Sequence, residues 1–215
     1  MIKKEIIKRI LSSIILLPIV LFFIIKGSFL FNFFIFICFL ITTYEWLKLS
    51  KNSLLKLIGT IFILISFYTI FNIRNEFDRD YFHLLLVVII CVSTDIGGYI
   101  FGNIFKGPKL TKISPKKTYS GVIGSFLLSL IFTNLFLDFL SNVETFEFTK
   151  EMFLFILLVS LVSQIGDIII SYFKRKSKIK DTGIIIPGHG GILDRIDGMI
   201  FALPFAYVFF LNFNF

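Results

Sequence analysis

The segment IIIPGHGGILDRIDG, residues 184–198, is a strongly polar cluster in a mostly apolar chain. Gly190 and Gly191 allow the backbone to approach a ligand closely and to adopt positive φ. Asp194 and Asp197 are three residues apart, which places both carboxylates on one face of a helix. Carboxylate oxygens are preferred ligands of Mg²⁺, which usually completes its shell with water and substrate phosphates. The segment therefore predicts a site for phosphoryl or nucleotidyl transfer.

Two further segments carry residues suited to the same chemistry. Asp167, Ser171 and Lys174 are spaced i, i+4 and i+7, so they share one face of a helix. Residues 114–118, SPKKT, offer hydroxyls, backbone N–H groups and two lysines to phosphate oxygens. Structural alternatives stay open for both segments. The lysines can serve membrane topology alone, and the intramembrane aspartate can pair with an arginine of another helix.

The elements that must position these residues are membrane-spanning helices. The chain has 215 residues and is 56% hydrophobic, whereas soluble domains are about 45–50% apolar. A helix needs about 20 apolar residues to cross a bilayer core of about 30 Å, and backbone in lipid must satisfy its own hydrogen bonds. We therefore predict an all-α, polytopic transmembrane helical bundle of about seven helices, with the first helix retained because it lacks a small-x-small cleavage site. The predicted spans are 10–26, 28–46, 54–72, 81–103, 119–139, 151–172 and 192–213.

Charge predicts the orientation of the bundle. Lysine and arginine are enriched in cytoplasmic loops, and most of the 22 here fall on one side when the N-terminus is placed in the cytoplasm. Charged residues within or at the ends of spans are costly and mark functional sites. Four aspartates fit this description and fall toward the cytoplasmic ends of their spans: Asp95, Asp167, Asp194 and Asp197. We therefore expect a multi-pass protein of the cell (inner) membrane with a cytoplasmic-face active site. Residues 1–80 form N-terminal helices and residues 81–215 the catalytic region.

The run from Ser171 to Asp197 reads S-Y-F-K-R-x4-K-D-x-G-x2-I-P-x-H-G-G-I-x-D-R-I-D. It resembles the signature of the phosphatidate cytidylyltransferases, also called CDP-diacylglycerol synthases. Gln164-x-Gly166-Asp167 and the 114–118 loop with Gly121 also fit that family, so the similarity covers roughly residues 90–210. Such a long mixed pattern of charge, glycine and histidine at fixed spacing is highly specific.

The resemblance implies a function and its residues. The family converts CTP and phosphatidate to CDP-diacylglycerol and pyrophosphate in phospholipid biosynthesis. The resemblance implies Mg²⁺ held by Asp167 and Asp194. It implies further catalytic roles for Asp197, Lys174, Arg175, Lys180, Asp181, His189 and Arg195. It implies substrate binding by Ser114, Lys116, Lys117, Thr118, Ser171, Gly190 and Gly191.

The resemblance also implies partners and one open question. The expected partners are CTP, phosphatidate in the bilayer, membrane lipids and a second copy in a homodimer, with no nucleic acid. Ser120 and Ile170 stand where many members of the family have glutamate. Each change removes one candidate carboxylate, so the sequence leaves a second cation position open.

Three rival classes share parts of this pattern. A CDP-alcohol phosphotransferase requires D-G-x2-A-R, and the residues after Asp197 and Gly198 fail that pattern. A polyprenol kinase that uses CTP would need the same groups, but it would release CDP and no pyrophosphate. A cation transporter would explain intramembrane aspartates, yet it predicts carboxylates near the bilayer midplane, often in paired repeats. The sequence therefore favours the cytidylyltransferase.

Overall fold

The computed structural model describes residues 2–50, 52–77, 81–111, 114, 117–141, 148–186, 188 and 190–212. Over these residues the secondary structure is helical apart from two isolated β-bridges, Lys109 with Thr118 and Ile186 with Gly190. The helices are α1 (Ile2–Lys26), α2 (Ser28–Leu49), α3 (Ser53–Asn75), α4 (Phe82–Ile104), α5 (Tyr119–Ser141), α6 (Lys150–Lys176), α7 (Leu193–Ile196) and α8 (Met199–Asn212). The predicted all-α bundle is confirmed.

Five helices, α2 to α6, are long and apolar enough to cross a membrane by length and composition. The predicted span 192–213 is wrong as a single helix, because the structure divides it into α7 and α8 at Asp197 and Gly198. Glycine stabilises a helix interior least among residues other than proline. Gly198 is also buried where an added Cβ would lie 2.8 Å from the Ser163 carbonyl oxygen of α6. The apolar run hides this break because its hydropathy continues across it.

The chain forms two compact units. The first unit consists of Met1–Leu84 and Phe173–Asp197, and the second consists of Leu85–Tyr172 and Gly198–Phe215. Each unit therefore joins segments that are far apart in the sequence. The chain passes between the units at three places: near the start of α4, within α6, and at the α7–α8 break.

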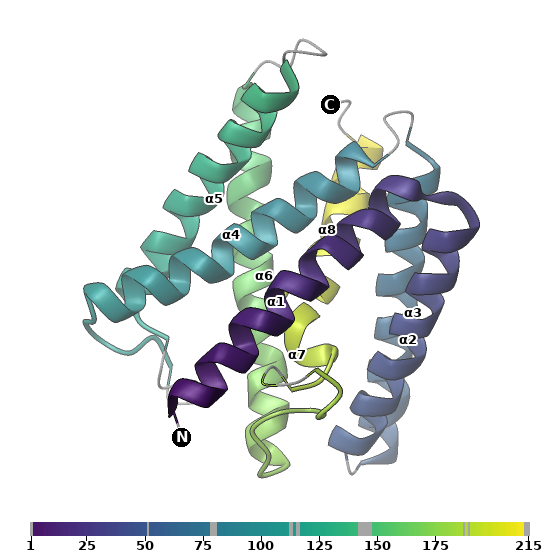
Figure 1. Cartoon of the computed structure of the whole chain (residues 1–215), viewed down its shortest axis with the longest axis vertical. Coiled ribbons are helices and arrows are strands. Elements are labelled where there is room, and N and C mark those ends of the chain that lie inside the picture. Colours follow the sequence, from purple (N-terminus) through teal and green to yellow (C-terminus); the bar gives the residue numbers. More distant parts are fainter. Residues whose placement is uncertain are drawn as a thin grey trace. The chain divides into compact units, whose positions relative to one another are not determined.

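In the first unit, α2 is the central packing element. It packs along α3 and also contacts α1 and α7, and α2 and α3 lie side by side in Figure 1. Arg74 at the end of α3 donates from Nε to the carbonyl oxygen of Ile24, at 2.8 Å, near the end of α1. Gly27 joins α1 to α2 at φ 61°, and a Cβ there would collide with the Arg74 guanidinium. This turn fixes the entry into α2.

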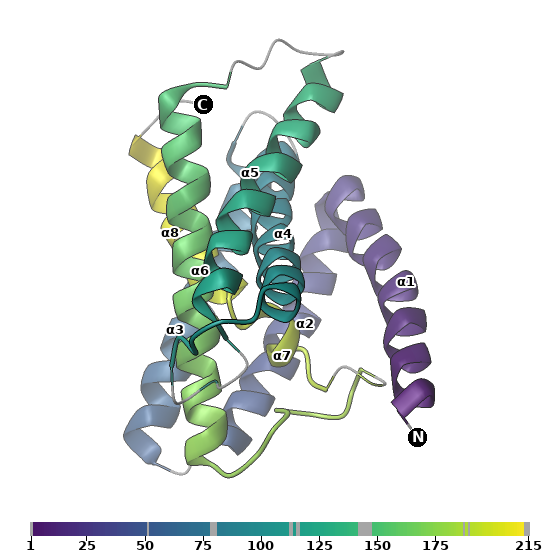
Figure 2. The ribbon, with the colours of Figure 1, turned by 90° about the vertical axis from the view of Figure 1, so that its left-hand side faces the viewer.

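In the second unit, α4 and α5 converge toward the loop that joins them (Figures 1 and 2). Gly97 permits this approach, because a Cβ there would lie 2.7 Å from the backbone carbonyl carbon of Gly124. Small residues commonly allow membrane helices to pack this closely. A buried hydrogen bond of 2.8 Å from Thr94 of α4 to Ser160 of α6 ties in the third helix. The loop between α4 and α5 is thereby brought to α6.

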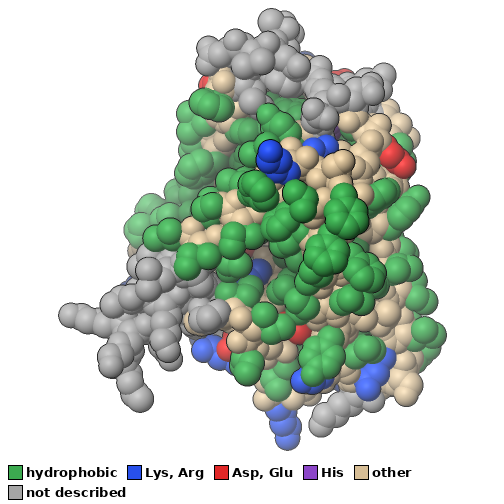
Figure 3. Space-filling model, turned by 45° about the vertical axis from the view of Figure 1, so that its right-hand side comes forward, with side chains coloured by type: hydrophobic (Ala, Val, Ile, Leu, Met, Phe, Trp, Pro, Cys, Tyr) green, Lys and Arg blue, Asp and Glu red, His purple; other side chains and the backbone are tan. Residues whose placement is uncertain are grey.

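The outer faces of the helices are apolar. Phe29 is 77% exposed and Phe139 is 76% exposed, and many other large apolar side chains are also exposed. Figure 3 shows hydrophobic side chains over most of the described surface in that view, with few charged groups among them. In lipid such faces need no covering by protein, so this surface agrees with a polytopic membrane bundle.

Candidate active site

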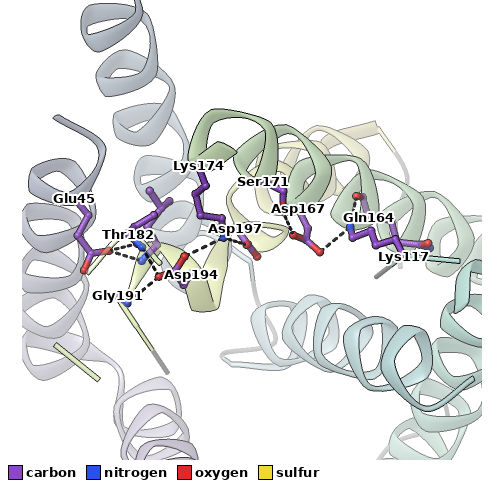
Figure 4. Close-up of polar contacts among 11 residues, drawn as sticks. Glu45, Lys117, Gln164, Asp167, Ser171, Lys174, Thr182, Gly191, Asp194 and Asp197 are labelled. Carbon is purple, nitrogen blue, oxygen red and sulfur yellow. Dashed lines mark hydrogen bonds and ion pairs between the residues drawn. The ribbon is translucent and has the colours of Figure 1, made fainter. Parts of the chain in front are cut away.

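The first candidate group, here the Asp194 cluster, consists of Asp194, Asp197, Lys174, Thr182 and Gly191 in the first unit (Figure 4). Lys174 Nζ lies 2.9 Å from Asp194 Oδ1 and 3.4 Å from Asp197 Oδ2. The backbone N–H groups of Thr182 and Gly191 donate to Asp194 Oδ2 at 2.7 and 2.9 Å. One lysine therefore lies against two carboxylates, and both oxygens of Asp194 accept hydrogen bonds.

The Asp194 carboxyl is held in its charged form. Burial by itself raises its pKa, but the N–H group of Gly191, the hydrogen bond and charge of Lys174, and the N–H group of Thr182 together outweigh burial. The pKa therefore lies below the usual 3.8. Hydrogen bonds to the charged form and a nearby cation both favour ionisation. Asp194 is consequently an anion at neutral pH, although its side chain is only 3% exposed.

The glycine-rich loop before α7 is shaped around this carboxylate. Ile186 and Gly190 exchange two backbone hydrogen bonds of 2.9 and 3.1 Å, which close the loop. Gly190 has φ 87°, and a Cβ there would approach Asp194 Oδ2 to 2.5 Å. A residue with a side chain would be strained at this φ and would also press on the carboxylate. The predicted close approach of this backbone to a ligand stays a prediction, and the structure shows a close approach to the Asp194 carboxylate.

The second candidate group, here the Asp167 cluster, consists of Asp167, Ser171, Gln164 and Lys117 in the second unit. Lys117 Nζ lies 2.7 Å from Asp167 Oδ2 and donates to the Gln164 carbonyl oxygen at 3.2 Å. Ser171 donates to Asp167 Oδ1 at 3.2 Å, as the spacing on one helix face predicts. The partner of this aspartate in the structure is thus a lysine of the 114–118 loop, where an arginine had been the structural alternative.

The other described residues of the 114–118 loop support its shape. The Lys117 N–H donates to the Ser114 carbonyl oxygen at 3.0 Å, which closes a turn. Thr118 Oγ1 accepts from the Gly121 N–H at 3.1 Å and lies 3.0 Å from Ser120 Oγ, and so it caps the start of α5. Ser120 also donates to the Lys106 carbonyl oxygen. Ser120, where the family resemblance implied a glutamate, therefore serves as a structural hydroxyl.

The remaining predicted residues are placed as follows. Arg175, Lys180, Asp181 and Arg195 are exposed, and Asp95 is exposed on α4. Lys116 and His189 lie outside the described residues. The structure thus gathers Asp194, Asp197, Lys174, Gly190 and Gly191 in one unit, and Asp167, Ser171 and Lys117 in the other. The catalytic roles of all these residues stay predictions.

One buried carboxylate was missed by the sequence analysis. Glu45 near the end of α2 is 2% exposed and accepts hydrogen bonds from the backbone N–H groups of Ile192 and Leu193 at the start of α7. The rule that selected the four aspartates, a charged residue near the end of an apolar run, also selects Glu45. It was passed over because its run lies outside the part of the chain with recognisable motifs.

The carboxylates fit a divalent cation only if other ligands join them. Within the described residues, no group of three or more His, Cys, Asp or Glu side chains is arranged to hold a metal ion. Mg²⁺ is usually bound by one or two carboxylates together with waters and substrate phosphates. The Asp194 cluster, with two carboxylates against one lysine, offers hard oxygen donors and excess negative charge. This donor set is compatible with Mg²⁺ carried in with a phosphate substrate.

Comparison with known proteins identifies the family. The sequence model described as "Cytidylyltransferase family" matches residues 51–213. The chain belongs to the cytidylyltransferase family. It is 38% identical over 204 residues to a phosphatidate cytidylyltransferase of Rickettsia conorii, covering 92% of this chain and 88% of that protein. It is 37% identical over 211 residues to that of Rickettsia felis, covering 95% and 92%, and 37% identical over 169 residues to that of Haemophilus influenzae, covering 75% and 59%.

Family membership confirms the resemblance drawn from the 171–197 signature. It also confirms that the chain is an enzyme, a nucleotidyltransferase, and not the cation transporter considered above. Both clusters lie within residues 51–213, the part that matches the family. Glu45 lies outside that part.

Proposed function

We propose that this enzyme converts CTP and phosphatidate to CDP-diacylglycerol and pyrophosphate, a step of phospholipid biosynthesis. One observation carries the proposal. Asp194, held ionised by Lys174 and two backbone N–H groups, lies in a chain that matches phosphatidate cytidylyltransferases over about nine-tenths of both lengths. Charge at a fixed position is the main requirement of phosphoryl and nucleotidyl transfer.

The reaction needs charge control more than a covalent nucleophile. A phosphate oxygen of phosphatidate attacks the α-phosphorus of CTP, a new P–O bond forms, and the bond from the α-phosphorus to the bridging oxygen breaks. Pyrophosphate leaves with the electron pair of that bond. Lys174 and Lys117 are the cations placed beside the two central aspartates. We assign them to phosphate oxygens, because fixed cations stabilise charge that develops in the transition state.

The metal belongs to the same proposal. Asp194 would hold Mg²⁺, with Asp197 close to it through their shared lysine, and Asp167 stays the second ligand that the family resemblance implies. When bound, Mg²⁺ supplies charge neutralisation at the phosphates and polarises their oxygens. Lys174 is then no longer needed as the counter-ion of Asp194, and its Nζ is left for a phosphate oxygen. A second cation would need ligands other than residues 120 and 170, since Ser120 and Ile170 provide no carboxylate.

The placement in the cell is also proposed. One substrate is dissolved in lipid and the other in cytoplasmic water, so the site must lie at the membrane surface. The excess of lysine and arginine on one side of the predicted topology supports a cytoplasmic face. We also propose that the enzyme lies in the cell (inner) membrane and forms a homodimer.

Pyrophosphate release tests the reaction directly. The purified protein is given CTP and Mg²⁺, with and without phosphatidate, beside an Asp194→Asn variant. We expect pyrophosphate only when phosphatidate is present and only from the unaltered chain. Formation of CDP without pyrophosphate would replace the proposal with a lipid kinase. A fully active Asp194→Asn variant would remove the metal assignment while leaving the reaction in place.

A further inference from the structure

Glu45 joins α2 to the segment that leads into α7. Its Oε1 accepts from the Ile192 N–H at 3.1 Å, and its Oε2 accepts from the Leu193 N–H at 2.8 Å. The Thr182 hydroxyl also donates to Oε2, at 3.2 Å. A carboxylate that is 2% exposed is costly to bury unless donors satisfy it. Three donors from one segment do so here.

The surrounding backbone is shaped to admit this carboxylate. A Cβ on Gly183 would lie 2.5 Å from Glu45 Oε1, and a Cβ on Gly191 would lie 2.5 Å from Glu45 Cδ. Real Cβ atoms essentially never approach this closely. Two glycines of the signature therefore make room for a side chain that lies outside the signature.

The same segment holds Asp194. The Thr182 N–H donates to Asp194 while its hydroxyl donates to Glu45. The Gly191 N–H donates to Asp194, and the position that a Cβ of Gly191 would occupy is filled by the Glu45 carboxylate. Figure 4 shows Thr182 and Gly191 between the two carboxylates. Glu45 and Asp194 thus accept hydrogen bonds from the same stretch of chain, so one backbone conformation provides donors to both carboxylates.

We infer that Glu45 is a positioning residue for the reaction, which holds Thr182 and Gly191–Leu193 in the conformation that fixes Asp194. This inference rests on the proposed function. Without the carboxylate, the N–H groups of Ile192 and Leu193 lose their acceptors, and the segment is free to shift by the small distances that matter in catalysis. Glu45 touches no reacting atom in this assignment, and it acts through Asp194.

Two variants separate an acceptor role from a packing role. Gln has nearly the shape of Glu, but its NH₂ group would face a backbone N–H donor. Asp is one methylene shorter, but it keeps two acceptor oxygens. We therefore expect Glu45→Asp to retain more activity than Glu45→Gln, whereas a residue that only fills space would show the opposite order. Thr42→Val is the matched control, because Thr42 is fully buried on the same helix and its hydroxyl has no hydrogen-bond partner among the described residues.

The experiment measures kcat and KM for CTP by phosphatidate-dependent pyrophosphate release, together with amide hydrogen exchange over residues 182–196. For Glu45→Gln we expect kcat to fall at least about 10-fold with KM changed less than about 3-fold, roughly the loss from a misplaced catalytic group. Exchange should be faster at Ile192 and Leu193. Thr42→Val should match the unaltered protein in both measurements.

Three outcomes would overturn the inference. They are wild-type kcat in Glu45→Gln, a loss explained wholly by a smaller folded fraction, or a higher activity in Glu45→Gln than in Glu45→Asp. Failure of the proposed function is distinct from all three, because the unaltered protein would then release no pyrophosphate in response to phosphatidate.

Discussion

The two clusters hold their central aspartates by different means. Asp194 has a side chain only 3% exposed, and two of the donors to its carboxylate are backbone N–H groups. Asp167 has a side chain 29% exposed, and Lys117 and Ser171 both contact its carboxylate through their side chains. Exposed side chains change rotamer within nanoseconds, whereas backbone groups move only when a loop rearranges. The fold therefore fixes Asp194, and adjustable contacts hold Asp167.

Under the proposed function, the difference predicts a different role for each cluster. In the Asp194 cluster two carboxylates lie against Lys174, and such a pair of oxygen donors favours a cation. One carboxylate against one lysine leaves the Asp167 pair balanced, so opening it exposes both an anion and a cation. A rigid anionic site provides preorganised electrostatic stabilisation. A pair that opens can exchange its internal partner for substrate and metal.

The largest effect should come from removing the two central charges one at a time. Asp194→Asn should lower kcat by about 10³-fold or more, because an amide cannot satisfy Lys174 and two N–H donors together. Asp167→Asn should lower kcat by about 10²-fold, because its oxygen still accepts from Ser171 and Lys117 can turn to solvent. Pyrophosphate release measures both. Equal losses, or a larger loss at Asp167, would break the contrast between a fixed and an adjustable site.

The next largest effect should come from replacing the two lysines, and the two variants should differ more in stability than in rate. Lys174→Met leaves two poorly exposed carboxylates without their shared cation, and removing one partner of a buried pair costs about 3–5 kcal/mol. Lys117→Met removes a partly exposed pair that contributes about 0–1 kcal/mol. Thermal unfolding in detergent should therefore show a clearly lower Tm for the first variant only. Lys117→Met should instead raise KM for CTP or phosphatidate, and unchanged kinetics in both Lys117→Met and Lys116→Ala would return that loop to a topological role.

A smaller and more local effect is expected from a substitution in the glycine-rich loop before α7. Gly190→Ala combines a strained φ of 87° with a Cβ that presses on Asp194 Oδ2. We expect about a 10-fold loss of kcat, since misplacement of a reacting group by about 1 Å costs up to about 10²-fold. Gly107→Ala is the control, because its φ is 98° but its nearest described neighbour would be 4.0 Å away. If both variants lose activity equally, backbone strain and not the approach to Asp194 is responsible.

The sequence predicted contacts within one helix or one motif better than contacts between distant segments. The spacing of Asp167 and Ser171 gave their shared face, and the signature gave Lys174 and Asp194, because these relations depend on helix period and local motif. The contact of Lys117 with α6 was not predicted, because it depends on how α4 and α5 pack.

Two features of the fold, the break at Gly198 and the contacts of Glu45, were not predicted, for identifiable reasons. The break at Gly198 was hidden by continuous hydropathy, and Gly198 packs so closely on Ser163 that an added Cβ would collide with it. Glu45 interacts with residues 137 to 148 positions away, so neither periodicity nor a local motif could connect it to Asp194. Long-range contacts of this kind are set by tertiary packing and appear only in the folded chain.

The smallest expected effect concerns pH. The folded-state pKa of Asp194 lies below its ordinary value of 3.8, so its ionised form stabilises the fold at any pH above that value. This contribution is lost as pH falls through the folded-state pKa, because the unfolded state then binds the proton more readily. Thermal unfolding with a chelator present, from about pH 7 to about pH 3, should show the Tm of the unaltered protein falling toward that of Asp194→Asn. Parallel curves for the two proteins would mean that Asp194 is not held as an anion by its N–H donors and Lys174, and the contrast with Asp167 would lose its electrostatic basis.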